Sequence, residues 1–258
     1  MQPLNLRPLL EPIRDRIEAS LRPRLDLGFS DDDGTSSHGT RLGGLPAASA
    51  GTPWPAGANG PFTFLGQLDF EELTRLGGPE LGLPATGILA LFYDLSVGQT
   101  SGDPTAYQLI FAPRDAELLT PPPNARVLPR QALESTDATI PSMPHFFLDY
   151  QPHTWPGWDD IGVNENGYDT GVRAEYTNMY YGDAADQVRG NAHWIQQDPR
   201  VAELTPPEAW SLLWQISYQP SWQVQFSENF DSRMFLLIRD EDLAVSDFSH
   251  THLTWQTP

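Results

Sequence analysis

Cysteine and lysine are both missing from the 258-residue sequence. Without cysteine the chain can form no disulfide and no thiolate metal site, and a cysteine nucleophile is excluded. All 15 basic residues are arginine, which we interpret as a compositional bias of the genome rather than a functional feature. The lack of cysteine fits the cytoplasm, so we predict a cytoplasmic protein.

Long apolar runs are also missing. No stretch of 18 or more apolar residues occurs, so we expect no membrane-spanning helix and no membrane partner. The first residues, MQPLNLRPLLEPIRDRIEAS, carry charges inside their apolar stretch and lack a small-residue cleavage site. This pattern is not typical of a secretory signal.

The common local signatures of catalysis are not found. The sequence has no G-x-S-x-G elbow, no Walker phosphate loop, no H-E-x-x-H and no G-x-G-x-x-G that opens a helix after a strand. Serine or threonine catalysis stays open, but no pattern nominates a residue for it. The sequence therefore indicates no particular reaction, and we lean towards a protein that is not an enzyme.

Acidic residues outnumber basic ones by 34 to 15, which gives a formal net charge of −19. A surface of this sign repels the phosphate backbone, and no arginine-rich run interleaved with aromatic residues offers a local exception. Nucleic-acid binding is therefore disfavoured. Solubility explains the charge most simply, and attraction to a basic protein partner is the alternative.

Two stretches far apart in the chain follow the same pattern. GPFTFLGQLDF (60–70) and EAWSLLWQISY (208–218) both alternate apolar positions with small or polar ones, and Gln67 and Gln215 occupy the same place. ILALFYD (88–94) then parallels MFLLIRD (234–240), and AYQLIFAP (106–113) parallels THLTWQTP (251–258). Three matching elements in the same order predict a duplicated β unit.

The remaining segments complete the predicted fold. Apolar residues at helical spacing predict an N-terminal helix over about 9–22, and residues 170–188 predict a middle helix. Residues 30–61 are rich in turn formers and predict a long loop that is either packed as a structured loop or functional. We expect one domain over 1–258 of the α+β class. Its mixed, mainly antiparallel sheet is built from β repeat 1 (about 62–113) and β repeat 2 (about 210–258), which flank a middle region (114–209), and the two helices pack on it.

Histidines and acidic residues offer only weak metal hypotheses. His250 and His252 would share one face of a strand, with a third ligand from His145, His153 or His193, but paired histidines are more often surface or edge residues. The tract 155–171 resembles a calcium loop, yet Gly162 and Arg173 stand where the acidic anchors are needed. We therefore predict neither a metal nor another cofactor.

Tryptophans and the two equivalent glutamines are the candidate binding residues. Trp155, Trp158 and Trp194 lie outside the predicted repeat strands and could line a groove with Trp54 of the turn-rich loop. Packing is the more common role of tryptophan. Gln67 and Gln215 suit fixed hydrogen bonds within the sheet before any ligand contact.

Several short motifs follow one another in a characteristic order: RLGGLPAASAGTPWP, PFTFLGQLDF, GILALFYD, HWIQQDP, WSLLWQI and MFLLIRDEDLAVSDF. In this order they resemble the motifs of the YwqG-like family of bacterial proteins of unknown function. The resemblance covers about residues 40–258, and FSENFDS (226–232) departs from the family pattern. It implies a compact cytoplasmic α+β protein with no assigned activity. Some members are similar to components of bacterial toxin–immunity loci, which implies a basic toxin as partner.

Three functions follow as hypotheses. The first is a non-catalytic cytoplasmic interaction protein, immunity-like, that meets a basic protein through its acidic surface. The second is a small-ligand or carbohydrate-binding protein whose site includes Trp54 and Trp194. The third is a hydrolase that uses a histidine-bound metal or carboxylates such as Asp159 and Asp160. The oligomeric state is open.

Overall fold

A computed structural model describes residues 8–30, 38–98, 100–135, 140–142, 186–196, 198–206, 209–217, 219 and 232–257. In these residues every strand pairing is antiparallel. The main sheet has 11 strands. Its strands follow one another in the order β15 (Thr251–Gln256), β14 (Arg233–Arg239), β13 (Trp210–Ser217), β12 (Asp186–Arg189), β1 (Arg22–Ser30), β10 (Gln131–Ser135), β2 (Arg41–Leu42), β6 (Thr63–Asp69), β7 (Ile88–Tyr93) and β8 (Tyr107–Ala112), while β11 (Ile140–Ser142) pairs with β1 outside this order.

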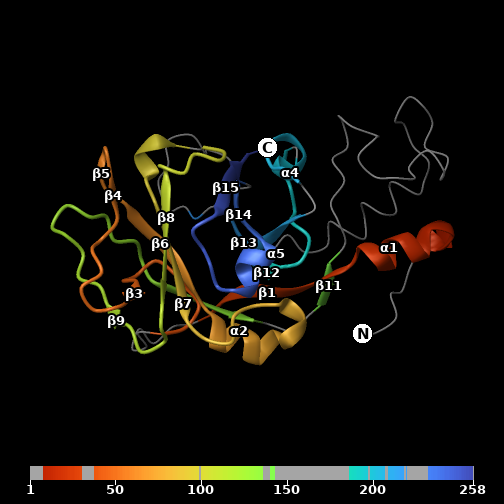
Figure 1. Ribbon diagram of the computed structural model, residues 1–258, viewed down its shortest axis with the longest axis horizontal. Helices are drawn as coiled ribbons and strands as arrows, with labels where there is room; N and C mark the ends of the chain where they lie inside the picture. Colours follow the sequence, from red (N-terminus) through yellow and green to blue (C-terminus); the bar gives the residue numbers. More distant parts are fainter. Residues whose placement is uncertain are drawn as a thin grey trace.

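The sheet curves until its two end strands approach each other, so that it is nearly closed into a barrel (Figure 1). The loop between β7 and β8 makes the closing contacts with β15. Gly102 N donates to Leu253 O and Trp255 N donates to Thr100 O, both at 3.0 Å. Two short ribbons lie outside the barrel sheet: β3 (Ala47–Ala48) with β9 (Glu117–Leu118), and β4 (Ala56–Gly57) with β5 (Gly60–Pro61).

The predicted α+β class is wrong, because the described chain is mostly β. Its helices are all short: η1 (Pro8–Ile13), α1 (Arg14–Ser20), α2 (Phe70–Gly77), η2 (Pro79–Leu81), η3 (Leu95–Val97), α4 (Pro199–Ala202) and α5 (Asp240–Ala244). A sheet that closes on itself buries its own inner face, so it needs no helical layer to cover that face.

The two predicted helices have different outcomes. The N-terminal helix is present as η1 followed by α1, with Leu10 and Ile17 fully buried, and it ends at Ser20 because β1 begins at Arg22. Of the middle helix, residues 170–185 lie outside the described residues. Its last three predicted positions, 186–188, belong to strand β12.

The six segments that repeat in the sequence are all strands, and they form two three-stranded meanders, β6-β7-β8 and β13-β14-β15. The first pair of each meander carries a register shift at the same place, between Phe64 and Gly66 in one and between Leu212 and Trp214 in the other. Each meander is preceded in the sheet by a short strand, β2 or β12, and then by β10 or β1. The sheet order therefore reads alike from both ends.

In the chain β1 precedes the first meander and β10 precedes the second, but in the sheet each of them lies on the side of the other meander. β1 pairs with β12, the neighbour of the second meander, while β10 pairs with β2, the neighbour of the first. β1 and β10 also pair with each other at the centre of the sheet. One apolar cluster fills the barrel with residues of both halves, including Leu27 of β1, Leu133 of β10 and Trp214 of β13. The two halves thus share a single core.

Candidate functional site

The two glutamines predicted as binding residues are fully buried and hold equivalent turns. Gln67 Oε1 accepts a hydrogen bond from Ala47 N at 3.1 Å, and Gln215 Oε1 accepts one from His193 N at 2.8 Å. Each bond joins the first strand of a meander, β6 or β13, to the segment that follows β2 or β12. Gln67 Nε2 also donates to Gly39 O at 3.1 Å. These bonds give the side-chain amides a structural role in both halves.

The turns that these glutamines hold share an unusual backbone. Gly43 and Gly44 have φ angles of 61° and 72°, and at the equivalent place Arg189 and Gly190 have 63° and 77°. A Cβ on Gly43 would lie 1.9 Å from Pro129 O, so only glycine fits there. Arg189, by contrast, takes up a left-handed conformation that is uncommon for a residue with a side chain.

The contacts of Arg189 account for its conformation. Its guanidinium group donates to Leu81 O at 2.8 Å, to Leu212 O at 3.3 Å and to Asp240 Oδ1 at 3.1 Å. One side chain thus ties together η2, β13 and the start of α5. Because three fixed acceptors hold the guanidinium group, we infer that they stabilise the left-handed backbone at this residue.

The predicted tryptophans are not brought together among the described residues. Trp54 is half-buried, donates from Nε1 to Phe62 O at 2.8 Å and meets the edge of Phe92. Trp194 is buried with its ring centroid 4.5 Å from that of Phe235. The two belong to separate apolar clusters, one in each half of the barrel. Trp155 and Trp158 lie outside the described residues.

The predicted histidine pair is split between two surroundings. His252 is buried, and its Nε2 lies 3.4 Å from Glu203 Oε2 at the seam where the barrel closes. Burial lowers the pKa of His252, while the Glu203 carboxylate acts in the opposite direction. His250 is exposed and lies beside Asp247. His193, one of the predicted third ligands, instead has its Nε2 3.2 Å from Arg24 Nη1. His145 and His153 lie outside the described residues.

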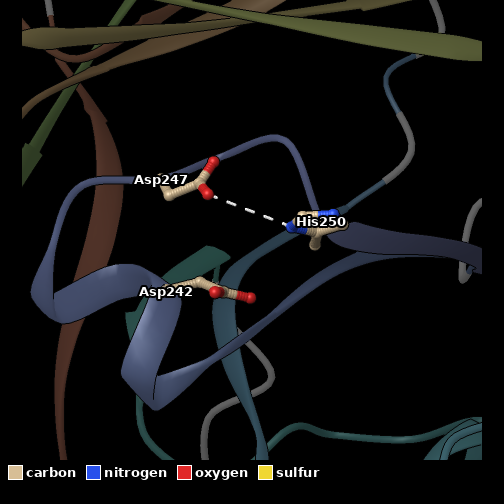
Figure 2. Close-up of side chains that lie close together, drawn as sticks. All are labelled: Asp242, Asp247 and His250. Carbon is tan, nitrogen blue, oxygen red and sulfur yellow. Dashed lines mark ion pairs between the residues drawn. The ribbon is translucent and has the colours of Figure 1, made fainter.

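His250 belongs to a surface group with Asp242 and Asp247 in the segment between β14 and β15, and Figure 2 shows the three side chains side by side. One ligand atom of each lies within 4.8 Å of the others. Asp247 Oδ1 accepts hydrogen bonds from the backbone N and the Oγ of Ser249 at 2.9 and 2.6 Å, and these bonds lower the pKa of Asp247. The Asp247 carboxylate is therefore held in its ionised form by its hydrogen bonds with Ser249.

A buried carboxylate lies at the start of β12, the strand between β1 and β13. Asp186 of β12 is 5% exposed and accepts a hydrogen bond from Ser217 N at 2.6 Å. Burial raises the pKa of Asp186 to about 6, against the hydrogen bonds from Ser217 and the charge of Arg233, which lower it. No pattern in the sequence indicated this residue, because Asp186 lies within the predicted helix.

Replacing Asp186 with asparagine should stabilise the protein at pH 7. An acid whose folded-state pKa lies above its unfolded value stabilises the fold at low pH and loses that contribution as pH rises through about 6. The difference corresponds to about 2–3 kcal/mol for Asp186. Urea titrations between pH 4 and 7 should show the wild type losing stability relative to D186N. Parallel pH profiles for the two proteins would contradict the assignment.

Acidic side chains gather around one end of the barrel. We define the acidic end as α2, η2, α5 and the turn 245–250. Arg189 joins η2 to α5, and the stacked rings of Phe70 and Phe248, 5.7 Å apart, join α2 to the turn. Figure 1 shows α2 and α5 on the same side of the barrel. The exposed acids of this surface are Glu71, Glu80, Asp240 and Glu241, and Asp247 is half-buried.

Several arginines contribute little positive charge to the surface, because the fold uses them internally. Arg41 is fully buried and donates to the carbonyl oxygens of His38, Gly39 and Leu45. Arg24 is buried against Asp26, with Nε 2.7 Å from Oδ1. At the acidic end, Arg114 pairs with Glu71 at 2.7 Å. Because Asp69 and Asp186 are buried as well, burial removes two charges of each sign among the described residues, and the surface keeps the acidic excess.

Comparison with protein families gives a match over most of this chain. The model of a domain of unknown function, DUF1963, matches residues 40–257. The match runs from just before β2 to just after β15. It agrees with the predicted membership of a family of unknown function, whereas the YwqG-like label itself stays a prediction. A search of curated proteins found no match. No helix in the described part of the chain is long and apolar enough to cross a membrane.

Proposed function

We propose that this chain, which belongs to the DUF1963 family of unknown function, is a non-catalytic cytoplasmic protein that binds a basic partner protein through its acidic end. The observation that carries the proposal is the excess of exposed acids at the acidic end. Glu71, Glu80, Asp240 and Glu241 are exposed there, against the exposed arginines Arg75 and Arg114.

The acidic end has the composition of a recognition surface. Glu241 is 76% exposed, and Val245 close by is 74% exposed. An apolar side chain within an acidic rim suits a partner that presents basic residues around an apolar one. An excess of one charge on a surface also steers an oppositely charged protein towards it and raises its association rate. The immunity-like role implied by the family resemblance is one case, in which the partner is a basic toxin.

Affinity capture of the tagged protein from the lysate of its own cell, at about 0.05 M and about 0.3 M salt, tests the proposal. We expect a stoichiometric basic protein that is lost as the salt rises, because screening weakens the attraction. Retention of no protein at either salt concentration would contradict the proposal.

Charge variants then test the surface. The double variant Glu80→Gln and Glu241→Gln removes two exposed charges from the acidic end and should weaken binding about two- to tenfold. The control double variant, Glu18→Gln with Glu134→Gln, also removes two negative charges, but from α1 and β10, and it should leave the affinity for the partner unchanged. Equal weakening by both pairs would show that net charge, rather than the acidic end, attracts the partner.

A further inference from the structure

The outer edge of β8 is open at Leu109 and Phe111, whereas its first residue, Tyr107, donates from its hydroxyl to Thr251 O of β15 at 2.7 Å. Asp94 N donates to Ala106 O at 2.8 Å, next to the first pair of the β7–β8 ladder, Tyr93 with Tyr107. Because antiparallel neighbours alternate in the direction of their backbone groups, Leu109 and Phe111 direct their N–H and C=O groups away from β7. In the part of the chain that the structure describes, no backbone hydrogen bond reaches these outward groups.

The same edge is covered in the other half of the barrel. Leu109 pairs with Leu91 as Leu253 pairs with Leu236, so β15 is the counterpart of β8. The outward groups of β15 are bonded, since Leu253 O accepts from Gly102 N and Trp255 N donates to Thr100 O. The loop from β7 to β8 supplies these bonds. Its counterpart between β14 and β15 forms α5 and a turn instead, and it pairs with no strand among the described residues.

The sequence of β8 carries none of the usual protections of an edge strand. Proteins block such edges with charged side chains, proline or bulges, because an open edge recruits other strands. β8 reads YQLIFA, without a charged residue or a proline, and its register with β7 has no shift. Phe111 is 40% exposed. The edge is therefore suited to pairing with an added strand.

The surroundings of the edge select the charge of that strand. The rings of Phe111 and Phe248 lie 4.9 Å apart, and Phe248 directly follows Asp247. Asp247 lies beside Asp242 and His250 (Figure 2), and the buried Oδ2 of Asp242 has no hydrogen-bond partner. The open edge is thus continuous with the acidic end, where basic side chains of an added strand would meet carboxylates.

We propose that β8 binds an extended basic segment of the partner protein as an additional strand of the sheet. This inference rests on the proposed function and specifies how the partner binds. The backbone groups of Leu109 and Phe111 would supply the hydrogen bonds, and the carboxylates around Asp247 would select basic side chains. A second copy of the chain is a poorer occupant, because each copy carries a net charge of −19 and the two repel each other.

Three synthetic peptides test the inference. The first alternates arginine with valine; the second has glutamine in place of arginine; the third keeps arginine but has N-methylated backbone amides. We expect only the first to bind well, with the other two at least about tenfold weaker. On binding, the amides of Leu109 and Phe111 should exchange hydrogen at least about tenfold more slowly. The amide of Trp255, already bonded, serves as the internal control.

The outcomes separate the two proposals. Equal binding of the N-methylated peptide would overturn strand addition while leaving the basic partner standing. Equal binding of the glutamine peptide would overturn the basic partner, and slowed exchange at Leu109 would then still support strand addition. Slow exchange at Leu109 without peptide, increasing with protein concentration, would identify a second copy as the occupant and overturn the proposed partner.

Discussion

Replacing Trp214 with alanine is expected to lower the free energy of unfolding by about 3–5 kcal/mol. Trp214 is fully buried in the core cluster that residues of both halves form together. Its Cη2 atom lies 2.9 Å from the position that a Cβ on Gly66 would take. Gly66 is the residue equivalent to Trp214 in the other half, so the indole fills space that its own counterpart leaves empty. Urea unfolding followed by circular dichroism measures the loss.

Gly66→Ala provides the reciprocal test. The added Cβ would lie 2.6 Å from Arg41 O and 2.9 Å from Leu42 Cδ2 as well as against Trp214. Since Arg41 O is a backbone atom in a paired strand, it cannot move freely, and we expect a loss of about 1–3 kcal/mol. The double variant should lose less than the sum of the single losses, because removal of the indole relieves one contact. A loss below about 1 kcal/mol for Trp214→Ala would contradict the shared core.

Arg41→Met should cost about 3 kcal/mol of stability. Arg41 is fully buried, and its guanidinium group donates to Leu45 O at 2.6 Å, to His38 O at 3.2 Å and to Gly39 O at 3.3 Å. Methionine replaces the apolar stem but leaves three carbonyl oxygens without this donor. The same urea experiment measures the effect.

Arg75→Met is the matched control for this variant. Arg75 is exposed on α2, so its loss should change stability by no more than about 0.5 kcal/mol. Equal effects of the two substitutions would mean that the internal bonds of Arg41 do not stabilise the fold, and that its burial has no energetic role.

The sequence located strands well where one face of the pattern is strongly apolar. The segments 62–70 and 210–218 contain β6 and β13, and the other four repeated segments are strands too. Aligning the two repeats by sequence nevertheless shifts β14 by one residue relative to β7, when compared with the strand pairing in the structure. Gln67 pairs with Ala90 and Gln215 with Phe235, whereas matching the aspartates that end the two segments would make Leu236 the counterpart of Ala90. Only the pairing reveals this register.

Other strands depend on partners that the sequence pattern cannot reveal. β1 reads RPRLDLGFS and β12 reads DQVR, with charged residues among few apolar ones. Their pairing, Leu25 with Val188, joins segments far apart in the chain. A local pattern contains no information about such a partner, so β12 was predicted as the end of a helix. The α+β prediction followed from these missing strands.

The candidate site was predicted in part. The equivalence of Gln67 and Gln215 in the sequence matches equivalent bonds in the structure, to Ala47 N and His193 N. The acidic end and the open edge of β8 were not predicted. They arise from the packing of Phe248 on Phe70 and Phe111, which brings separate segments together.

The exchange of β1 and β10 between the halves has a consequence for the order of folding during synthesis. The strands β6, β7 and β8 pair with their nearest neighbours in sequence, so this meander can form as soon as it leaves the ribosome. β1 is made earlier, yet Leu27 must wait for Ser135 and Leu25 for Val188. Although β1 is synthesised before this meander, it is therefore among the last of the described strands to find its partners, and we expect β1 to limit the rate of barrel closure.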